Sequence, residues 1–186
     1  MEKTDWDLVL RQVRDWADRA HGTQMRKYTP ERYIVHPVRV MECCSRYTSE
    51  QPVLAAALLH DVLEDTPETA EGLQAFLVTV MPNADAQRTL QLTVELTDVY
   101  VKAAYPYWNR RKRKLREGDR LVRASPEAHT IKYADILDNS LEIADQDPAF
   151  ATRYLREALE LLERLRKGHP DLRQLALDTV RSRLKR

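Results

Sequence analysis

The 186-residue sequence predicts an all-α protein built as a helical bundle. Only four glycines occur in the whole chain, which leaves little room for tight β-hairpins. Apolar residues recur instead at three- and four-residue steps, which places them on one face of a helix. No alternating strand pattern, internal repeat or low-complexity tract in the sequence competes with this interpretation.

The first helix is expected to begin near Thr4 and to run to about residue 20. Its apolar residues fall on one helical face: Trp6, Val9, Leu10, Val13, Trp16, Ala17 and Ala20. Thr4 is its candidate N-cap. Asp7 is favourable in the first turn, because a carboxylate there faces the positive end of the helix dipole.

Prolines mark the beginnings of later helices. Pro37, Pro52, Pro126 and Pro148 each stand just before a helix-like run, where the missing backbone N–H does no harm. The run at 53–59 is apolar almost all round. A surface helix would show a polar stripe, so this run predicts a central helix that is enclosed by others.

Further helices complete the expected bundle, at roughly 69–80, 85–96, 107–116, 126–144, 148–167 and 171–185. The longest connections between the expected elements are 22–33, 99–106 and 118–125, and function often lies on such loops. The length fits a single domain over 1–186, with its core at about 5–167 and a C-terminal helix at 171–185.

Composition and charge narrow the expected partners and location. The chain is an ordinary globular mixture, and its formal net charge is only +1, so bulk charge gives no reason to expect nucleic acid or an anionic membrane as a partner. The longest apolar stretch, at 52–59, is too short to span a membrane, and the N-terminus lacks the pattern of a signal peptide. Cys43 and Cys44 are adjacent and are the only cysteines, which suits a reducing compartment. We therefore expect a cytoplasmic protein.

Four ionisable residues follow the apolar run: His60, Asp61, Glu64 and Asp65. Burying a charge without a partner is costly, so such residues at the end of a buried helix favour a shared partner, and a cation is the simplest one. On a helix, His60 and Glu64 lie one turn apart, as do Asp61 and Asp65. A metal held by the first residue of each pair would have the second residue close by, to handle protons or orient water.

Two other segments can complete a metal shell. His36 precedes Pro37, which places its imidazole at an element boundary, and Asp135 lies in an apolar-periodic helix. Two imidazoles and two carboxylates form a mixed nitrogen and oxygen shell, which favours Mn, Fe or Zn over Ca. Each residue alone is more often structural, as a packed histidine, a helix cap or an ion-pair partner. Their order along the chain, each in an apolar helical context, predicts a joint metal site.

Four motifs carry a resemblance to a known family. They read Ala20-His21-x-x-Gln24-x-Arg26-Lys27, Tyr33-Ile34-x-His36-Pro37, Ala57-Leu58-Leu59-His60-Asp61-x-x-Glu64-Asp65 and Lys132-x-Ala134-Asp135-x-x-x-Asn139. Over about 16–144 the sequence resembles the alarmone hydrolase branch of the HD superfamily, which includes the hydrolase half of the bifunctional Rel/Spo enzymes and the small alarmone hydrolases. The Glu-Asp pair that follows His-Asp makes the resemblance specific to this branch.

The resemblance implies an HD-domain helical bundle that hydrolyses the 3′-diphosphate of guanosine tetraphosphate or pentaphosphate and releases pyrophosphate. It implies Mn²⁺, or another divalent transition metal, as the cofactor. The metal ligands that it implies are His36, His60, Asp61 and Asp135. Glu64 and Asp65 match the acidic pair that activates water and manages protons, and which of them acts as acid or base stays open.

The resemblance also implies residues that face the nucleotide. Arg26 and Lys27 match a basic pair at the nucleobase end, while Lys132 and Asn139 match the pocket wall near the ribose and phosphates. The chain departs from the family at Asp138, where an aromatic residue is usual, and at Arg32, where a proline is usual. The extra negative charge of Asp138 keeps open one alternative, an HD phosphatase acting on NADPH or a nucleoside monophosphate. A second alternative, of a different class, is a catalytically silent nucleotide-binding module, and the intact set of metal ligands with Glu64 and Asp65 argues against it.

Two remaining features allow more than one interpretation. The basic run at 110–116 is either a solvated helix face or a source of one or two side chains that reach the substrate phosphates. Nucleic-acid binding by this run is disfavoured, because the nearby aromatic residues form no recognisable stacking platform. The C-terminal helices could pack on the domain or on a second subunit, which leaves a homo-oligomer open.

Overall fold

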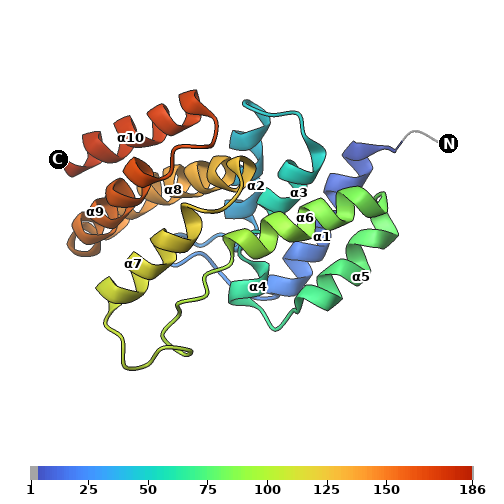
Figure 1. Cartoon of the computed structure of the whole chain (residues 1–186), viewed down its shortest axis with the longest axis horizontal. Coiled ribbons are helices and arrows are strands. Elements are labelled where there is room, and N and C mark those ends of the chain that lie inside the picture. The colour runs from blue at the N-terminus through green and yellow to red at the C-terminus, as the bar shows by residue number, and fades with distance from the viewer. Residues whose placement is uncertain (1–3, 186) are drawn as a thin grey trace. The chain divides into compact units, whose positions relative to one another are not determined.

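The computed structural model describes residues 4–185, apart from the side chains of residues 148 and 149, and within them it has helices but no named strand (Figure 1). A single isolated bridge joins Met25 and Arg32. The prediction of an all-α protein is therefore confirmed. Among the described residues, none of the helices is both long enough and apolar enough to cross a membrane.

The chain divides into two compact units, with the boundary between Thr97 and Asp98. The helices of the first unit are α1 (Trp6–His21), α2 (Val35–Ser45), α3 (Gln51–Leu59), α4 (Val62–Asp65), α5 (Ala70–Val80) and α6 (Asn83–Leu96). Those of the second unit are α7 (Arg110–Leu121), α8 (Pro126–Gln146), α9 (Pro148–Arg164) and α10 (Pro170–Leu184). A single domain over 1–186 stays a prediction, and its ends at 1–3 and 186 lie outside the described residues.

The centre of the first unit is α3. Every residue from Val53 to Leu59 is buried, as the apolar run predicted, and α1, α2 and α6 all pack against this helix. Trp16 on α1 stacks on Phe76 of α5, with ring centroids 5.0 Å apart. Burying an apolar helix on all sides is a main source of stability, because each large aliphatic side chain contributes roughly 1.5–3 kcal/mol.

The two ends of α1 show how local chemistry sets its limits. The N-cap is Asp5 and not Thr4: the Asp5 carboxylate accepts a hydrogen bond from the backbone N–H of Leu8 at 3.1 Å. The expected cap was therefore one residue early, because an extended Asp5 places its own oxygen over the first turn. The helix ends at Gly22, whose positive φ of 58° favours glycine.

Two of the prolines that were expected to mark helix starts stand at different positions in the first turns of their helices. Pro126 stands at the first position of α8, where Ser125 caps the helix by accepting from the backbone N–H of Ala128. Pro37 lies inside the first turn of α2, which begins two residues earlier at Val35. The sequence placed the helix start after Pro37, but a proline in a first turn is tolerated because the N–H groups there lack intrahelical partners.

The basic helix is longer and later than expected. It was predicted at 107–116, with a connection at 118–125, whereas α7 continues through Gly118 to Leu121. A Cβ built on Gly118 would lie 2.5 Å from Nη1 of Arg164 on α9. Glycine leaves room there for the Arg164 guanidinium. Gly118 and Leu121 are buried and α7 packs against α9, so packing outweighs the weak helix propensity that suggested a loop.

The second unit is organised around α8, against which α9 and α10 both pack, as the ribbon shows (Figure 1). The corner between α9 and α10 is fixed to α8 by hydrogen bonds. The phenol of Tyr133 donates to the carbonyl of Leu165 at 2.9 Å, and burial raises the pKa of this phenol. The backbone N–H of His169 donates to Thr130 Oγ1 at 3.0 Å. The C-terminal helix thus packs on its own unit.

Candidate metal centre

Two buried histidines face each other in the first unit. His36 is the second residue of α2, and His60 follows the last residue of α3. Their exposed fractions are only 1% and 2%, their rings meet edge to face with centroids 5.2 Å apart, and one ligand nitrogen of each lies within 4.8 Å of the other. Two imidazoles buried together at this distance form a candidate site for a metal that prefers nitrogen ligands.

The tautomer of His60 follows from its hydrogen bond. Its Nδ1 lies 2.7 Å from the carbonyl oxygen of Ala57. A carbonyl oxygen can only accept, so Nδ1 carries the proton and the neutral ring offers the lone pair of Nε2. This bond to the last turn of α3 fixes the ring orientation, as is usual for a histidine that ligates a metal.

Asp61 brings a carboxylate to the two histidines. Its Oδ2 lies 3.1 Å from Nε2 of His60 and 3.7 Å from Nε2 of His36. The same oxygen accepts a hydrogen bond of 2.6 Å from the phenol of Tyr33. Two imidazole nitrogens and one carboxylate oxygen therefore converge within the first unit, and this donor set fits a divalent transition metal better than Ca²⁺.

The acidic pair predicted for proton handling lies on the next short helix. Glu64 and Asp65 are exposed on α4, and the backbone N–H of Asp65 bonds to the carbonyl of Asp61 at 2.9 Å. Asp61 and Asp65 are thus one turn apart, as expected, although α3 ends before His60 and the expected continuous helix is broken there. Gln24 donates from Nε2 to Asp65 Oδ2 at 3.3 Å.

The two basic residues predicted in the loop between α1 and α2 differ in burial. Arg26 is buried, with its guanidinium carbon 5.6 Å from the centroid of the Tyr33 ring. Lys27 is exposed and donates from Nζ to the hydroxyl of Tyr28 at 2.8 Å. The structure therefore brings Arg26 against Tyr33, which contacts Asp61.

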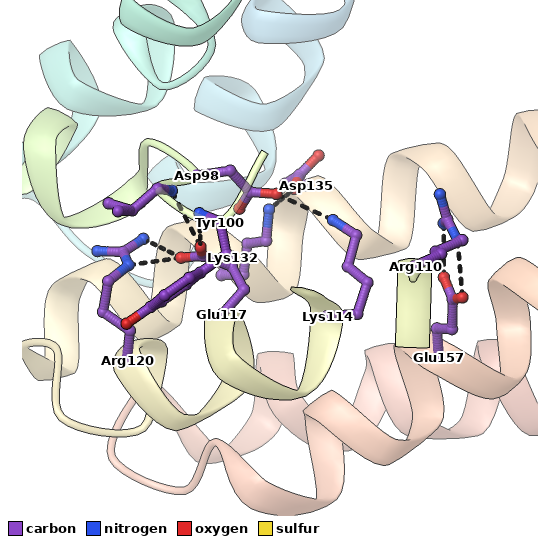
Figure 2. A network of polar contacts seen from close by, with 10 residues as sticks. Asp98, Tyr100, Arg110, Lys114, Glu117, Arg120, Lys132, Asp135 and Glu157 are labelled. Carbon is purple, nitrogen blue, oxygen red and sulfur yellow. Dashed lines mark hydrogen bonds and ion pairs between the residues drawn. The ribbon is translucent and has the colours of Figure 1, made fainter. Parts of the chain in front are cut away.

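In the second unit, one face of α8 carries the other predicted residues. Asp135 is 6% exposed, and both of its carboxylate oxygens accept hydrogen bonds. Lys132 donates to Oδ2 at 2.7 Å and Asn139 donates to Oδ1 at 2.6 Å. The predicted ligand and the two predicted wall residues are thus together on one helix face, and Figure 2 shows Lys132 and Asp135 with their neighbours.

Two cations of the basic run of α7 form close pairs with acids (Figure 2). Arg110 makes a two-pronged pair with Glu157, at 2.8 and 2.6 Å, and this hydrogen bonding raises the pKa of the guanidinium. Lys114 pairs with Asp98 at 2.9 Å. Arg110 and Lys114 both lie in the run that the sequence offered as a source of contacts to the substrate phosphates. Their pairing with acids favours the structural interpretation for these two residues.

Glu117 is a structural residue of this network that the sequence did not single out. It is 3% exposed, and its Oε2 accepts the backbone N–H groups of Val99 and Tyr100 at 2.9 and 3.0 Å. Its Oε1 accepts from Arg120 at 2.5 Å. The only sequence signal was an acid in a basic helix four residues before a buried leucine, Leu121, which is too common to be specific.

The fold and the site together define a class: an all-helical protein whose buried helix α3 leads into a histidine–aspartate cluster that could hold a metal. No protein-family model matches the chain. Curated relatives do match part of it. A guanosine-3′,5′-bis(diphosphate) 3′-pyrophosphohydrolase of Aquifex aeolicus is 38% identical over 65 residues, which cover 35% of this chain and 9% of the relative.

Other relatives agree. The enzyme of the same name from Haemophilus influenzae is 46% identical over 55 residues, which cover 30% of this chain and 8% of the relative. The bifunctional (p)ppGpp synthase/hydrolase SpoT of Escherichia coli K12 is 43% identical over 65 residues, covering 35% of this chain and 9% of the relative. These matches thus span less than a tenth of the curated relatives' length.

A solved structure resembles nearly the whole chain. It belongs to a metazoan ortholog of SpoT, described as hydrolysing ppGpp and playing a role in starvation responses. The TM-score is 0.78 with 26% sequence identity, and the alignment covers 98% of each chain. The comparisons confirm the resemblance of this chain to the alarmone hydrolase branch of the HD superfamily.

Proposed function

We propose that the chain is a metal-dependent phosphohydrolase that removes the 3′-diphosphate of guanosine tetraphosphate or pentaphosphate as pyrophosphate. The observation that carries the proposal is the convergence of His36, His60 and Asp61 in the first unit, with Oδ2 of Asp61 at 3.1 and 3.7 Å from the two Nε2 atoms. The names of the curated relatives and of the metazoan structure support ppGpp as the substrate.

The residues present fit a divalent metal, and we take Mn²⁺ as the ion. His36, His60 and Asp61 would hold it from the first unit, and Asp135 would hold it from the second. Lys132 and Asn139 orient the Asp135 carboxylate through one hydrogen bond to each oxygen. When bound at such a site, the ion lowers the pKa of a bound water and polarises a phosphoryl oxygen.

Glu64 and Asp65 are the groups that move protons in this proposal. An attacking water must lose a proton as it becomes a nucleophile, and a carboxylate close to the ligands can take or relay that proton. Both side chains are exposed on α4, directly after Asp61, so solvent can exchange protons with them. The hydrogen bond from Gln24 holds Asp65 in place beside the centre.

In this proposal Lys132 supplies positive charge to the polyphosphate, and Arg26 and Lys27 contact the nucleobase end of the substrate. Lys132 already lies 2.7 Å from a carboxylate oxygen of Asp135, so its ammonium is placed beside a proposed metal ligand. A diphosphate leaving group carries several negative charges, and preorganised cations stabilise the charge that develops as it departs. Asn139, on the same face of α8, contributes an amide to the same wall.

The proposal also includes the expected partners and location of the chain. The ligand is a small nucleotide, with nucleic acid not expected as a partner. The expected cytoplasmic location, which rests on the adjacent cysteines Cys43 and Cys44 of the sequence, stays part of the proposal. A homo-oligomer stays open.

The test is pyrophosphate release from guanosine tetraphosphate by the Mn²⁺-loaded protein, with Asp61→Ala assayed beside it. NADPH and nucleoside monophosphates serve as competing substrates for the alternative phosphatases. We expect pyrophosphate from the alarmone alone, and none from the variant. Phosphate release from the other nucleotides, with the alarmone untouched, would overturn the substrate. No turnover of any nucleotide by the folded, metal-loaded protein would instead favour a silent nucleotide-binding module.

A further inference from the structure

Tyr33 makes a contact whose consequence goes beyond the ligand set. It lies in the connection between α1 and α2, and its phenol donates a hydrogen bond of 2.6 Å to Oδ2 of Asp61. That oxygen is also the atom that faces Nε2 of His60 at 3.1 Å and Nε2 of His36 at 3.7 Å. A carboxylate oxygen has two lone pairs, so the phenol can occupy one and leave the other directed at the imidazoles.

The ring of Tyr33 is held from two sides. His21, the last residue of α1, packs on it with centroids 4.5 Å apart and an interplanar angle of 36°. His36 meets it edge on at 6.1 Å. The backbone N–H of Tyr33 also donates to the carbonyl of Gln24 at 3.0 Å. These contacts fix both the ring and the backbone that carries it, so the hydroxyl has a defined position.

His21 itself is fixed as well. It is 6% exposed, and its Nδ1 lies 2.9 Å from Oε1 of Gln24. The amide of Gln24 in turn donates to Asp65 at 3.3 Å. His21 at the end of α1 is therefore linked to two carboxylates. It contacts Asp61 through the ring of Tyr33 and Asp65 through the amide of Gln24.

We propose that Tyr33 is a positioning residue for the Asp61 carboxylate, and that the ring of His21 holds Tyr33 in place. The inference rests on the proposed metal centre. In this arrangement the phenol selects one carboxylate rotamer and keeps Oδ2 towards the two histidines before any ion arrives. Residues that orient metal ligands by hydrogen bonds are typically worth about 10- to 100-fold in metal affinity.

The experiment is a calorimetric titration of Mn²⁺ into the metal-stripped wild type, Tyr33→Phe and Tyr133→Phe. Tyr133→Phe is the control, because it also removes a phenol hydroxyl, one in the second unit that donates to the Leu165 carbonyl and accepts from the backbone N–H of Gly168. We expect the Kd for Mn²⁺ to rise about 10- to 100-fold in Tyr33→Phe and to stay at the wild-type value in the control. Circular dichroism verifies that each variant is folded.

A second pair of variants tests the role of His21 and does not depend on Tyr33→Phe folding. His21→Ala removes the packed ring, whereas His21→Phe keeps a ring at 4.5 Å stacking distance without the imidazole nitrogens. We expect weaker Mn²⁺ binding in His21→Ala and recovery in His21→Phe. Equal Kd values for the wild type and Tyr33→Phe, or no recovery in His21→Phe, would overturn the positioning roles and leave the metal centre standing. A wild type that binds no Mn²⁺ would overturn both.

Discussion

The histidine–aspartate centre of the first unit and the charged network on α7 in the second unit use ionisable side chains in opposite ways. On α7, several cations each pair with an acid: Arg110 pairs with Glu157, and Lys114 pairs with Asp98. In the first unit, His36 and His60 instead gather around the carboxylate of Asp61, and a phenol donates to that same carboxylate.

The difference teaches that the kind of polar group marks a site better than the density of charge. The network on α7 is the most basic part of the chain, yet its pairs neutralise one another within the protein. The centre in the first unit presents lone pairs of nitrogen and oxygen to a common region, which is the arrangement a cation requires. Substitutions that affect one region and spare the other test this contrast between metal binding in the first unit and charge pairing in the second.

The largest effect is expected for His60→Ala. In the proposed centre His60 is a ligand whose tautomer is fixed by the 2.7 Å contact between its Nδ1 and the Ala57 carbonyl oxygen, so its loss would remove an oriented ligand. We expect no measurable Mn²⁺ retention after gel filtration and no pyrophosphate release. Metal content by mass spectrometry provides the measurement.

The matched control is His129→Ala, which removes an equally buried histidine from the second unit. His129 is 1% exposed, its Nε2 contacts the Leu121 carbonyl at 2.8 Å, and its Nδ1 accepts from the backbone N–H of Lys167. We expect lower thermal stability with metal content unchanged. Wild-type metal content in His60→Ala would contradict the assignment of the centre.

A smaller effect is expected for Glu64→Gln, which preserves size but removes the ability to take a proton. Loss of a proton-transfer group typically slows turnover by about 10²- to 10⁴-fold, while the metal ligands stay intact. We therefore expect wild-type Mn²⁺ content with kcat reduced by about two orders of magnitude or more. Glu68→Gln is the control, because Glu68 is an exposed glutamate in the connection that follows α4. Equal kcat values for the two variants would remove Glu64 from the mechanism.

The smallest effect on function is expected in the second unit, where Glu117→Gln weakens the α7 network. Glu117 is buried and accepts from two backbone N–H groups and from Arg120. Leaving part of such a group unsatisfied costs about 1–3 kcal/mol in the free energy of unfolding.

Glu157→Gln serves for comparison, because its pair with Arg110 is partly exposed and should be worth under about 1 kcal/mol. Urea unfolding measures both free energies, and we expect Mn²⁺ affinity to be unchanged in both variants. A large loss of Mn²⁺ affinity in Glu117→Gln would show that the two regions are not separable.

Much of the fold could be predicted from local patterns. The apolar run at 53–59 predicted the buried helix α3, and the periodic segments after it correspond to α5, α6, α8, α9 and α10 within a few residues. The errors lie at helix boundaries. At the start of α1 two neighbouring residues could both cap the helix, and Asp5 does so. At Gly118 the packing of α7, and not local propensity, decides where the helix ends. Propensity alone does not resolve either case.

The candidate site was predictable for a different reason. Its ligands come from motifs with fixed spacing, and the structure brings His36, His60 and Asp61 together in the first unit. Tyr33 and Gln24 belong to motifs of the sequence, but their supporting contacts were not predictable, because both residues lie in an aperiodic connection. They reach Asp61 and Asp65 across 28 and 41 positions of sequence. Contacts of that range depend on how the helices pack, which no local pattern encodes.

The most direct test of the account is an anomalous-scattering map from crystals of the Mn²⁺-loaded protein, recorded at the manganese absorption edge. We expect one strong peak, coordinated by Nε2 of His36, Nε2 of His60 and the carboxylates of Asp61 and Asp135. A peak coordinated by other residues, with His60 and Asp61 directed away from it, would contradict the metal centre proposed for this chain.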